Sequence, residues 1–150
     1  MEARMELEQF STLAPGVRSA LQAINKAVVE QGLEKALTEL IKLRASQING
    51  CAFCLQFHLA LAREAKISEI KLDLLAAWRE SGVFTSREVA ALAWTEALTC
   101  VTPAGVSDEI YAHVRKEFSE GELALLTSSV VVINAWNRIA IAFRFTPPVP

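Results

Sequence analysis

The 150-residue chain has little cysteine, histidine or tyrosine, with three Cys, two His and one Tyr. Three cysteines cannot form the dense disulfide framework that holds small secreted domains together. A chain of 150 residues does not need one, because a domain of that length buries roughly 68–70% of the surface that its unfolded form exposes. We find no linker, low-complexity tract or repeat array, so the sequence predicts a single domain over residues 1–150.

The chain also lacks an excess of charge of one sign. Fifteen Lys and Arg against seventeen Asp and Glu give a net charge of -2. The sequence contains no stripe of Lys and Arg that could neutralise phosphates, so nucleic acid is not an expected partner. The N-terminus "MEARMELEQFSTLAPGV" has alternating charges and no apolar core of the length that a signal peptide requires. We therefore expect a cytoplasmic protein, in which a cysteine pair is typically catalytic, redox-active or metal-binding rather than structural.

The most apolar segment, residues 123–145, is interrupted by Asn134, Asn137 and Arg138. A membrane-spanning helix needs about 20 mostly apolar residues with few or no charges, so we expect a buried core or interface helix and no membrane partner. Leaving out Tyr and adding six Gly turns the apolar fraction of 52% into about 55%, above the ~45–50% of ordinary domains. This excess predicts a homo-oligomer. The three polar residues follow i, i+3, i+4 spacing, so they either line a subunit contact or form hydrogen bonds within the chain.

Apolar residues recur at helical spacing along almost the whole chain, and no segment alternates convincingly like a strand. The sequence therefore predicts an all-α fold, a bundle of about seven helices separated by Gly, Pro or Ser/Thr. Two helix starts have the Ser/Thr-x-x-Glu spacing of a capping box, at Thr85 with Glu88 and at Ser119 with Glu122. The predicted helices cover residues 17–31, 33–48, 51–65 and 68–78, and three more begin near residues 86, 107 and 120.

The stretch "INGCAFCLQFH", residues 48–58, contains two of the three cysteines and one of the two histidines. Cys51 opens the predicted third helix, and on a helix turning 100° per residue Cys51, Cys54 and His58 share a stripe about 60° wide. His58 follows Cys54 at i+4, so its imidazole can reach the thiol or the group that the thiol attacks. Cys51 lies in the first turn, where unpaired backbone N–H groups and the helix dipole favour a thiolate.

This arrangement suits dithiol chemistry, because the thiolate is the nucleophile and a second cysteine one turn away can trap the oxidised form as a disulfide. The spacing alone leaves metal binding and inert packing open. A c-type haem site is excluded, since Leu55 and not His follows the second cysteine. A thioredoxin-type site needs a βαβ setting, for which no parallel strands are visible. A zinc site would need a carboxylate besides Cys51, Cys54 and His58.

Residues elsewhere in the chain have patterns typical of structural roles. We expect Cys100 to be a buried core thiol and His113, in "YAHVRK", to lie on a solvated helix face. Trp78 and Trp94 occur in the similar stretches "AAWRE" and "LAWTE". We expect both to be core aromatic residues of two similar helices that pack as a hairpin.

The periodicity of the second predicted helix gives Glu39 no special role. Glu39 points roughly 160° away from Ile41 of the apolar stripe, on the side that looks solvated. The pattern therefore predicts a surface carboxylate that pairs with Lys35 or Lys42.

Three stretches resemble a known family: "ELIKLRASQINGCAFCLQFH", with "FTSREVAALAWTEALT" and "INAWNRIAIAFR" downstream. They are similar to the alkyl hydroperoxidase D (AhpD)-like proteins of the carboxymuconolactone decarboxylase superfamily. The peroxidase motif of that family is Glu, eleven residues, CxxC, three residues and His. Glu39, Cys51, Cys54 and His58 match this motif position by position.

The resemblance implies an AhpD-like helical fold, assembly into trimers or larger rings such as hexamers, and thiol-dependent reduction of hydroperoxides without a cofactor. The implied catalytic residues are Cys51, Cys54, His58 and Glu39. One cysteine would attack the peroxide, the other would close the disulfide, and Glu39 and His58 would relay protons. A partner helix or subunit would then cover Glu39. The implied partners are a hydroperoxide substrate and a dithiol reductant, with lipoylated proteins among the candidates.

Phe53 is a departure from the fullest form of the motif. The alkyl hydroperoxidase D itself has a further relay His between the cysteines, where this sequence has Phe53. Losing one relay member implies a slower peroxidase rather than a loss of dithiol chemistry. An alternative function is a non-catalytic oligomer whose cysteine and histidine site binds a metal or senses redox state. The superfamily also contains decarboxylases without the cysteine pair, and the pair in this chain disfavours that activity.

Overall fold

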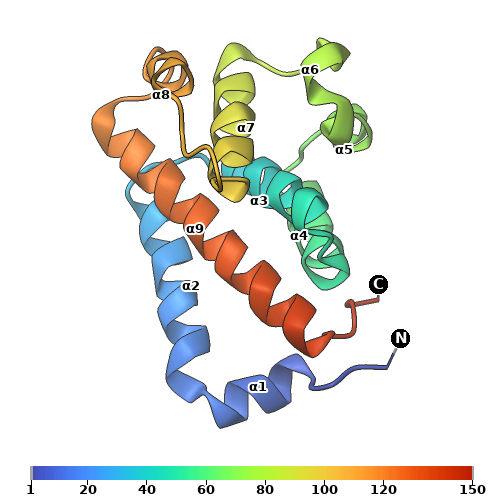
Figure 1. The fold of residues 1–150 in the computed structure, drawn as a ribbon. Helices are drawn as coiled ribbons and strands as arrows, with labels where there is room; N and C mark the ends of the chain where they lie inside the picture. The colour runs from blue at the N-terminus through green and yellow to red at the C-terminus, as the bar shows by residue number, and fades with distance from the viewer. Residues whose placement is uncertain (1, 150) are drawn as a thin grey trace.

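The computed structural model describes residues 2–149 and consists of helices and loops, with no β-strand in that range (Figure 1). The all-α prediction is confirmed. A 3₁₀ turn at Leu75–Ala77 lies between α5 and α6. The helices are α1 (Leu7–Leu13), α2 (Pro15–Glu30), α3 (Lys35–Asn49), α4 (Ala52–Glu64), α5 (Glu69–Asp73), α6 (Trp78–Ser81), α7 (Ser86–Thr99), α8 (Asp108–Val114) and α9 (Glu120–Phe143).

The helix predicted over residues 68–78 is divided into α5, the 3₁₀ turn and α6. Leu72, Leu75 and Trp78 are buried in one core cluster. Their three-residue spacing matches the 3.0 residues per turn of a 3₁₀-helix better than the 3.6 of an α-helix. Trp78 therefore begins the short α6, and the predicted hairpin of two similar helices is wrong. Trp78 and Trp94 are nevertheless both core residues, as predicted.

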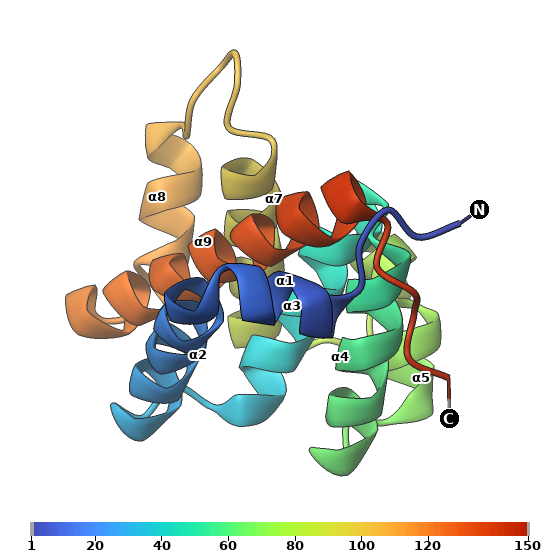
Figure 2. The ribbon, with the colours of Figure 1, turned by 90° about the horizontal axis from the view of Figure 1, so that it is seen from below.

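Helix α1 was not among the predicted helices. It has no side-chain cap and none of its residues is fully buried, so local signals for it are weak. It packs against α2 and against the C-terminal end of the chain, where the ring of Phe10 lies 5.9 Å from Phe143 and 6.0 Å from Phe145. The backbone N–H of Arg4 also donates to the carbonyl oxygen of Phe143 at 2.9 Å. The two ends of the chain consequently lie side by side (Figure 2).

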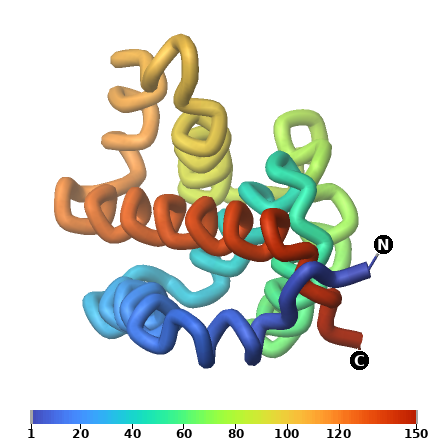
Figure 3. Tube along the Cα trace, turned by 60° about the horizontal axis from the view of Figure 1, so that its bottom comes forward, coloured from blue at the N-terminus to red at the C-terminus, as the bar shows by residue number. Residues whose placement is uncertain are grey.

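Helix α3 is the central element of the fold. It packs against α4, α7 and α9, and nine of its fifteen residues are buried, the polar Glu39, Lys42 and Ser46 among them. Helix α9 crosses the molecule in contact with α2, α3 and α7, with α2 on one side and α7 on the other (Figure 3). Because other helices pack around α3, it has no fully solvated face. The placement of Glu39 by periodicity assumed that such a face exists.

The polar residues of α9 form hydrogen bonds within the chain. Asn49 Nδ2 donates to Asn134 Oδ1 at 3.0 Å and to Asn137 Oδ1 at 2.8 Å, and Asn137 Nδ2 donates to Ser46 Oγ at 3.0 Å. Of the two arrangements considered from the sequence, the structure therefore contains the intrachain one. By length and composition α9 could cross a membrane, a property that it shares with core helices of soluble proteins, and its buried residues pack within this fold.

Candidate functional site

The cysteine pair lies where α3 reverses into α4. Gly50 ends α3 with φ +69° and ψ +34°, in the left-handed region that side chains other than glycine rarely adopt. Cys51 follows with an extended backbone, φ −87° and ψ +96°, and is the N-cap residue of α4. The prediction that the cysteine pair lies at the start of this helix is thus confirmed, with Cys51 as the cap and Ala52 as the first helical residue.

Cys51 and Cys54 are joined by a disulfide, and their Cα atoms are 5.3 Å apart. The backbone N–H of Cys54 donates to Cys51 Sγ at 3.2 Å, so the first sulfur caps the helix that contains the second. Both residues are nearly inaccessible, with 1% and 3% of their surface exposed. The Cα separation lies within the range that an unstrained backbone allows for a disulfide.

His58 lies one turn beyond Cys54 on α4 and forms a buried pair with Glu39 of α3. His58 Nδ1 lies 2.6 Å from Glu39 Oε2, and Lys42 Nζ donates to the other carboxylate oxygen at 3.3 Å. Burial raises the pKa of Glu39, but the hydrogen bond from His58 and the charge of Lys42 outweigh it, so the pKa lies below its usual value of 4.5. An ionised carboxylate only accepts hydrogen bonds, so Nδ1 of His58 carries the proton of this contact, and Nε2 is the ring nitrogen left to interact with other groups.

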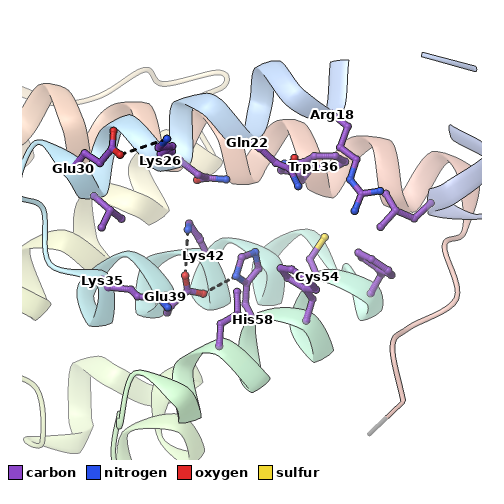
Figure 4. Close-up of a pocket in the computed structure, with 16 residues that line it drawn as sticks. Arg18, Gln22, Lys26, Glu30, Lys35, Glu39, Lys42, Cys54, His58 and Trp136 are labelled. Atoms are coloured by element: carbon purple, nitrogen blue, oxygen red, sulfur yellow. Dashed lines mark hydrogen bonds and ion pairs between the residues drawn. The ribbon is translucent and has the colours of Figure 1, made fainter. Parts of the chain in front are cut away.

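A cavity of about 450 Å³ connects these groups. Figure 4 shows the ring of His58 between the Glu39 carboxylate and the Cys54 side chain, with Gln22 and Lys26 of α2 on the opposite wall. Cys54, His58 and Glu39 all line the cavity, and α9 adds Trp136. Cys51 lines a different cavity of about 510 Å³, bordered by both ends of the chain. The two cysteines of one disulfide therefore line two separate cavities.

Phe53 lies between these two cavities and lines both. Its ring stacks on Phe57 with centroids 6.1 Å apart and meets Phe145 edge-on at 5.5 Å. The position that a relay histidine has in the fullest form of the motif is thus part of an aromatic cluster in this chain.

The structure corrects two residue-level predictions. Glu39 is only 3% exposed and not a surface residue, because α2 covers that side of α3 across the cavity. Its predicted pairing with Lys42 is present, but the pair is buried. Cys100 is exposed and not a core thiol, because it is the C-cap residue of α7, where the helix gives way to a loop. His113 is exposed, as predicted.

Sequence reasoning did not identify Asn25 and Trp136 as residues of the cavity, and it treated Lys42 only as a surface partner. The i, i+3 spacing of Glu39 and Lys42 was visible in the sequence, whereas the other two reach the cavity only through the packing of α2 and α9 on α3 and α4. Within residues 2–149, no three His, Cys, Asp or Glu side chains are grouped so that they could hold a metal ion.

The sequence of residues 15–97 matches the model of the carboxymuconolactone decarboxylase family, and this match covers more than half of the chain. The chain belongs to the carboxymuconolactone decarboxylase family. Within this family it is AhpD-like, as the resemblance in the sequence indicated.

Three family or fold relatives illustrate the match. The uncharacterized protein YdfG of Bacillus subtilis is 35% identical over 133 residues, which cover 89% of this chain and 90% of YdfG. The second is an Agrobacterium tumefaciens protein of unknown function, described as a candidate antioxidant defence protein AhpD, whose crystal structure is known. Its sequence is 38% identical, the TM-score is 0.92, and the match covers 99% of this chain and 100% of that one. The debrominase Bmp8 has 19% identity and a TM-score of 0.81, covering 92% of this chain and 74% of that one, and is similar in fold alone.

Proposed function

We propose that this protein is a thiol peroxidase that reduces hydroperoxides with the Cys51 and Cys54 dithiol and a Glu39 and His58 proton relay. The observation that carries the proposal is the shared cavity, in which Cys54, His58 and the ionised Glu39 meet beside a disulfide partner. A buried carboxylate that orients a histidine next to a thiol is the arrangement that activates a nucleophile.

The reaction begins with the reduced pair. Nε2 of His58 takes the proton of the Cys54 thiol, and the thiolate attacks the terminal oxygen of the hydroperoxide, breaking the O–O bond. The departing alkoxide takes that proton and leaves as an alcohol, while Cys54 becomes a sulfenic acid. Cys51 then attacks the Cys54 sulfur, a water molecule leaves, and the disulfide closes. In sum, two thiols and one hydroperoxide give one disulfide, one alcohol and one water.

The contact between Glu39 and His58 determines which ring nitrogen of His58 acts on Cys54 in this scheme. Because the carboxylate fixes the proton on Nδ1, the acceptor nitrogen of His58 is free to serve Cys54. Cys51 accepts the N–H of Cys54, which is one of the unpaired amides at the start of α4, and this contact favours a thiolate at Cys51 in the resolving step. A dithiol reductant, lipoylated proteins among the candidates, would restore the pair. We also propose that the working form is a homo-oligomer in a reducing compartment.

The test is a single-turnover oxidation of the reduced protein. The exposed Cys100 would react on its own account, so the parent protein should be the Cys100→Ser variant. One equivalent of cumene hydroperoxide should remove two thiols and yield one equivalent of cumyl alcohol. Mass spectrometry should locate the new disulfide between Cys51 and Cys54. Thiols that persist while the peroxide remains intact would refute the proposal.

The same reaction separates the roles of the two cysteines. In the Cys51→Ser variant a sulfenic acid should accumulate at Cys54 and react with dimedone, whereas Cys54→Ser should abolish it. A protein that oxidises once but that no dithiol donor re-reduces over repeated cycles would instead be a redox sensor, and metal bound at stoichiometric amounts after purification would support a metal site.

A further inference from the structure

The cavity that Cys54 lines carries more positive than negative charge, although the chain as a whole is acidic. Four cationic side chains and two carboxylates line it: Arg18, Lys26, Lys35, Lys42, Glu30 and Glu39. The net charge of the chain is -2, so the positive charge is a local property of the cavity. A cavity lined by charge of one sign concentrates the electric field and attracts small ions of the opposite sign.

The two carboxylates of the cavity are each paired with one of its lysines. Lys42 Nζ lies 3.3 Å from Glu39 Oε1, and Lys26 Nζ lies 3.6 Å from Glu30 Oε1. These four charges compensate one another within the cavity wall. The net positive charge of the cavity therefore comes from the two remaining cations.

The two remaining cations are Arg18 of α2 and Lys35 of α3, and Arg18 is the less exposed of them. Arg18 Nη1 donates to Glu8 Oε1 at 3.1 Å and to Ser11 Oγ at 3.0 Å, and both acceptors belong to α1. Glu8 is not among the residues that line the cavity, and its side chain is 83% exposed, so water screens its charge. Helix α1 thus fixes the guanidinium of Arg18 without neutralising the cavity.

The other two nitrogens of the Arg18 guanidinium are available to a ligand. Nε and Nη2 donate to no acceptor within residues 2–149. Neither atom is among the buried unpaired side-chain atoms of that range, so both are accessible. Figure 4 shows the guanidinium extending from α2 towards the side of the cavity that carries Cys54. Nε and Nη2 present two N–H groups side by side, the arrangement that binds both oxygens of a carboxylate.

The remaining lining of the cavity indicates the rest of the ligand. Apolar side chains cover most of it, among them Val29, Phe57, Leu61 and Trp136. Its volume of about 450 Å³ is typical of sites for small organic molecules. An apolar molecule with one carboxylate matches both the lining and the charge, whereas hydrogen peroxide matches neither.

We propose that the cavity takes an organic hydroperoxide that has an apolar body and a carboxylate, and that Nε and Nη2 of Arg18 bind the carboxylate. This inference deepens the proposed peroxidase function and rests on it. The carboxylate lies at the α2 wall, the apolar body fills the cavity, and the hydroperoxide group at the other end of the molecule meets Cys54. The carboxylate is unchanged by the reaction, so Arg18 determines specificity and takes no part in the chemical steps.

A binding experiment tests this role without requiring turnover. The oxidised protein is titrated by calorimetry with para-isopropylbenzoate and with para-isopropylbenzamide, which has nearly the same shape and no charge. The wild type should bind the benzoate about tenfold more tightly, and Arg18→Met should remove this preference while leaving the affinity for the amide unchanged. Tenfold is the lower end of the effect of a hydrogen bond between charged groups, because the side chain of Arg18 is 32% exposed.

Glu8 supplies the matched control for a structural role of Arg18. Glu8→Gln breaks the same ion pair but keeps the guanidinium, so the affinity for the benzoate should stay the same or rise. Equal losses for Glu8→Gln and Arg18→Met would mean that Arg18 acts by holding α1 in place, and would overturn the proposal. Lys35→Met should lower the affinity less than Arg18→Met does, because Lys35 is more exposed, and a larger loss would assign the carboxylate to Lys35 instead.

The inference and the function on which it rests fail in different ways. In single-turnover oxidation at low substrate concentration, cumene hydroperoxide with a para carboxylate should react about tenfold faster than cumene hydroperoxide itself, and Arg18→Met should equalise the two rates. A wild type that consumes both at equal rates would overturn the carboxylate site and leave the peroxidase intact. A wild type that prefers the benzoate through Arg18 but consumes neither hydroperoxide would refute the peroxidase and support the carboxylate site.

Discussion

Glu39 is a single residue whose charge organises the site. Each of its carboxylate oxygens has a donor, His58 on one and Lys42 on the other, so the buried charge is compensated within the cavity wall. Removing one partner of such a pair is far more disruptive than removing an exposed charge, because the remaining charge stays buried without compensation. Glu39 therefore couples the stability of the protein to the protonation state of its site.

Replacing Glu39 by Gln should change how stability depends on pH. A carboxyl whose pKa is lowered on folding contributes stability that is fully present above its unfolded value, near 4.5, and is lost as the pH falls through the lowered folded value. The difference in unfolding free energy between wild type and Glu39→Gln should therefore shrink as the pH falls below about 4.5. Urea denaturation from pH 7 to pH 3 measures it.

The comparison has an internal control. Glu30 lines the same cavity and pairs with Lys26, but its side chain is 63% exposed, so Glu30→Gln should change stability little at any pH. A wild-type minus Glu39→Gln difference that stayed constant down to pH 3 would contradict the assignment of a lowered pKa to Glu39.

Replacing Phe53 by His should destabilise the protein and not accelerate oxidation. The substitution removes the contacts of this ring with Phe57 and Phe145, and an aromatic pair is worth about 0.5–1.5 kcal/mol beyond its buried area. We expect a loss of about 1–3 kcal/mol in urea denaturation. Phe57→His, at a more exposed position that keeps the Phe53 to Phe145 contact, should cost less. Faster oxidation at an unchanged melting temperature would instead assign the position to the proton path.

The sequence could predict which residues of one helix lie close together, but not which residues of different helices do. The stripe of Cys54 and His58 follows from helical periodicity, so this part of the site was predictable. The burial of Glu39 depends on α2, and only the family motif indicated a role for it. Asn25 and Trp136 have no sequence signal at all, because they line the cavity only through the packing of α2 and α9.

The capped starts of the long helices could be predicted from local sequence, whereas the boundaries of the short helices could not. Both predicted capping boxes are present, and α7 and α9 begin at the predicted Ser86 and Glu120. Each capping box satisfies orphan N–H groups with neighbouring side chains, which needs no tertiary contact. The break between α5 and α6 does need one, since it depends on how buried side chains meet the core, and periodicity therefore missed it.

Replacing Ser119 by Ala should remove the cap of the long helix α9. The hydroxyl of Ser119 accepts the N–H of Glu122 at 3.2 Å, and loss of such a cap typically costs about 1 kcal/mol. Urea denaturation should register this loss. Ser128→Ala, inside the same helix, removes only a hydroxyl that donates to the carbonyl of Ala124 and should have a smaller effect. Equal losses for the two variants would mean that the cap contributes nothing specific.

At the scale of the whole molecule, apolar surface remains on the outer side of α9. Val131 is 59% exposed and Ile141 44%, and Val131 borders a shallow groove shared with Val101 and Arg138. Exposed apolar patches of this kind often mark contacts between proteins, and the apolar excess of the composition pointed in the same direction. The intrachain hydrogen bonds of Asn134 and Asn137 leave the apolar residues as the main candidates for that contact.

Light scattering at micromolar concentration should give several times the mass of one chain. Val131→Glu places a charge in the groove and should shift the protein towards smaller species, whereas Glu109→Gln on α8 should not. A wild-type protein with the mass of one chain would refute the homo-oligomer.

The adjacency of the two chain ends has a practical consequence for anyone who handles this protein. Arg4 from one end and Pro147 from the other border the cavity into which Cys51 opens. A bulky group attached next to Arg4 or Pro147 would therefore lie at the border of that cavity and obstruct the Cys51 side of the disulfide. Joining the ends and opening the chain at the exposed loop around Pro103 would move both attachment points away from the sulfur, so a circularly permuted protein offers a form in which labels leave this side accessible.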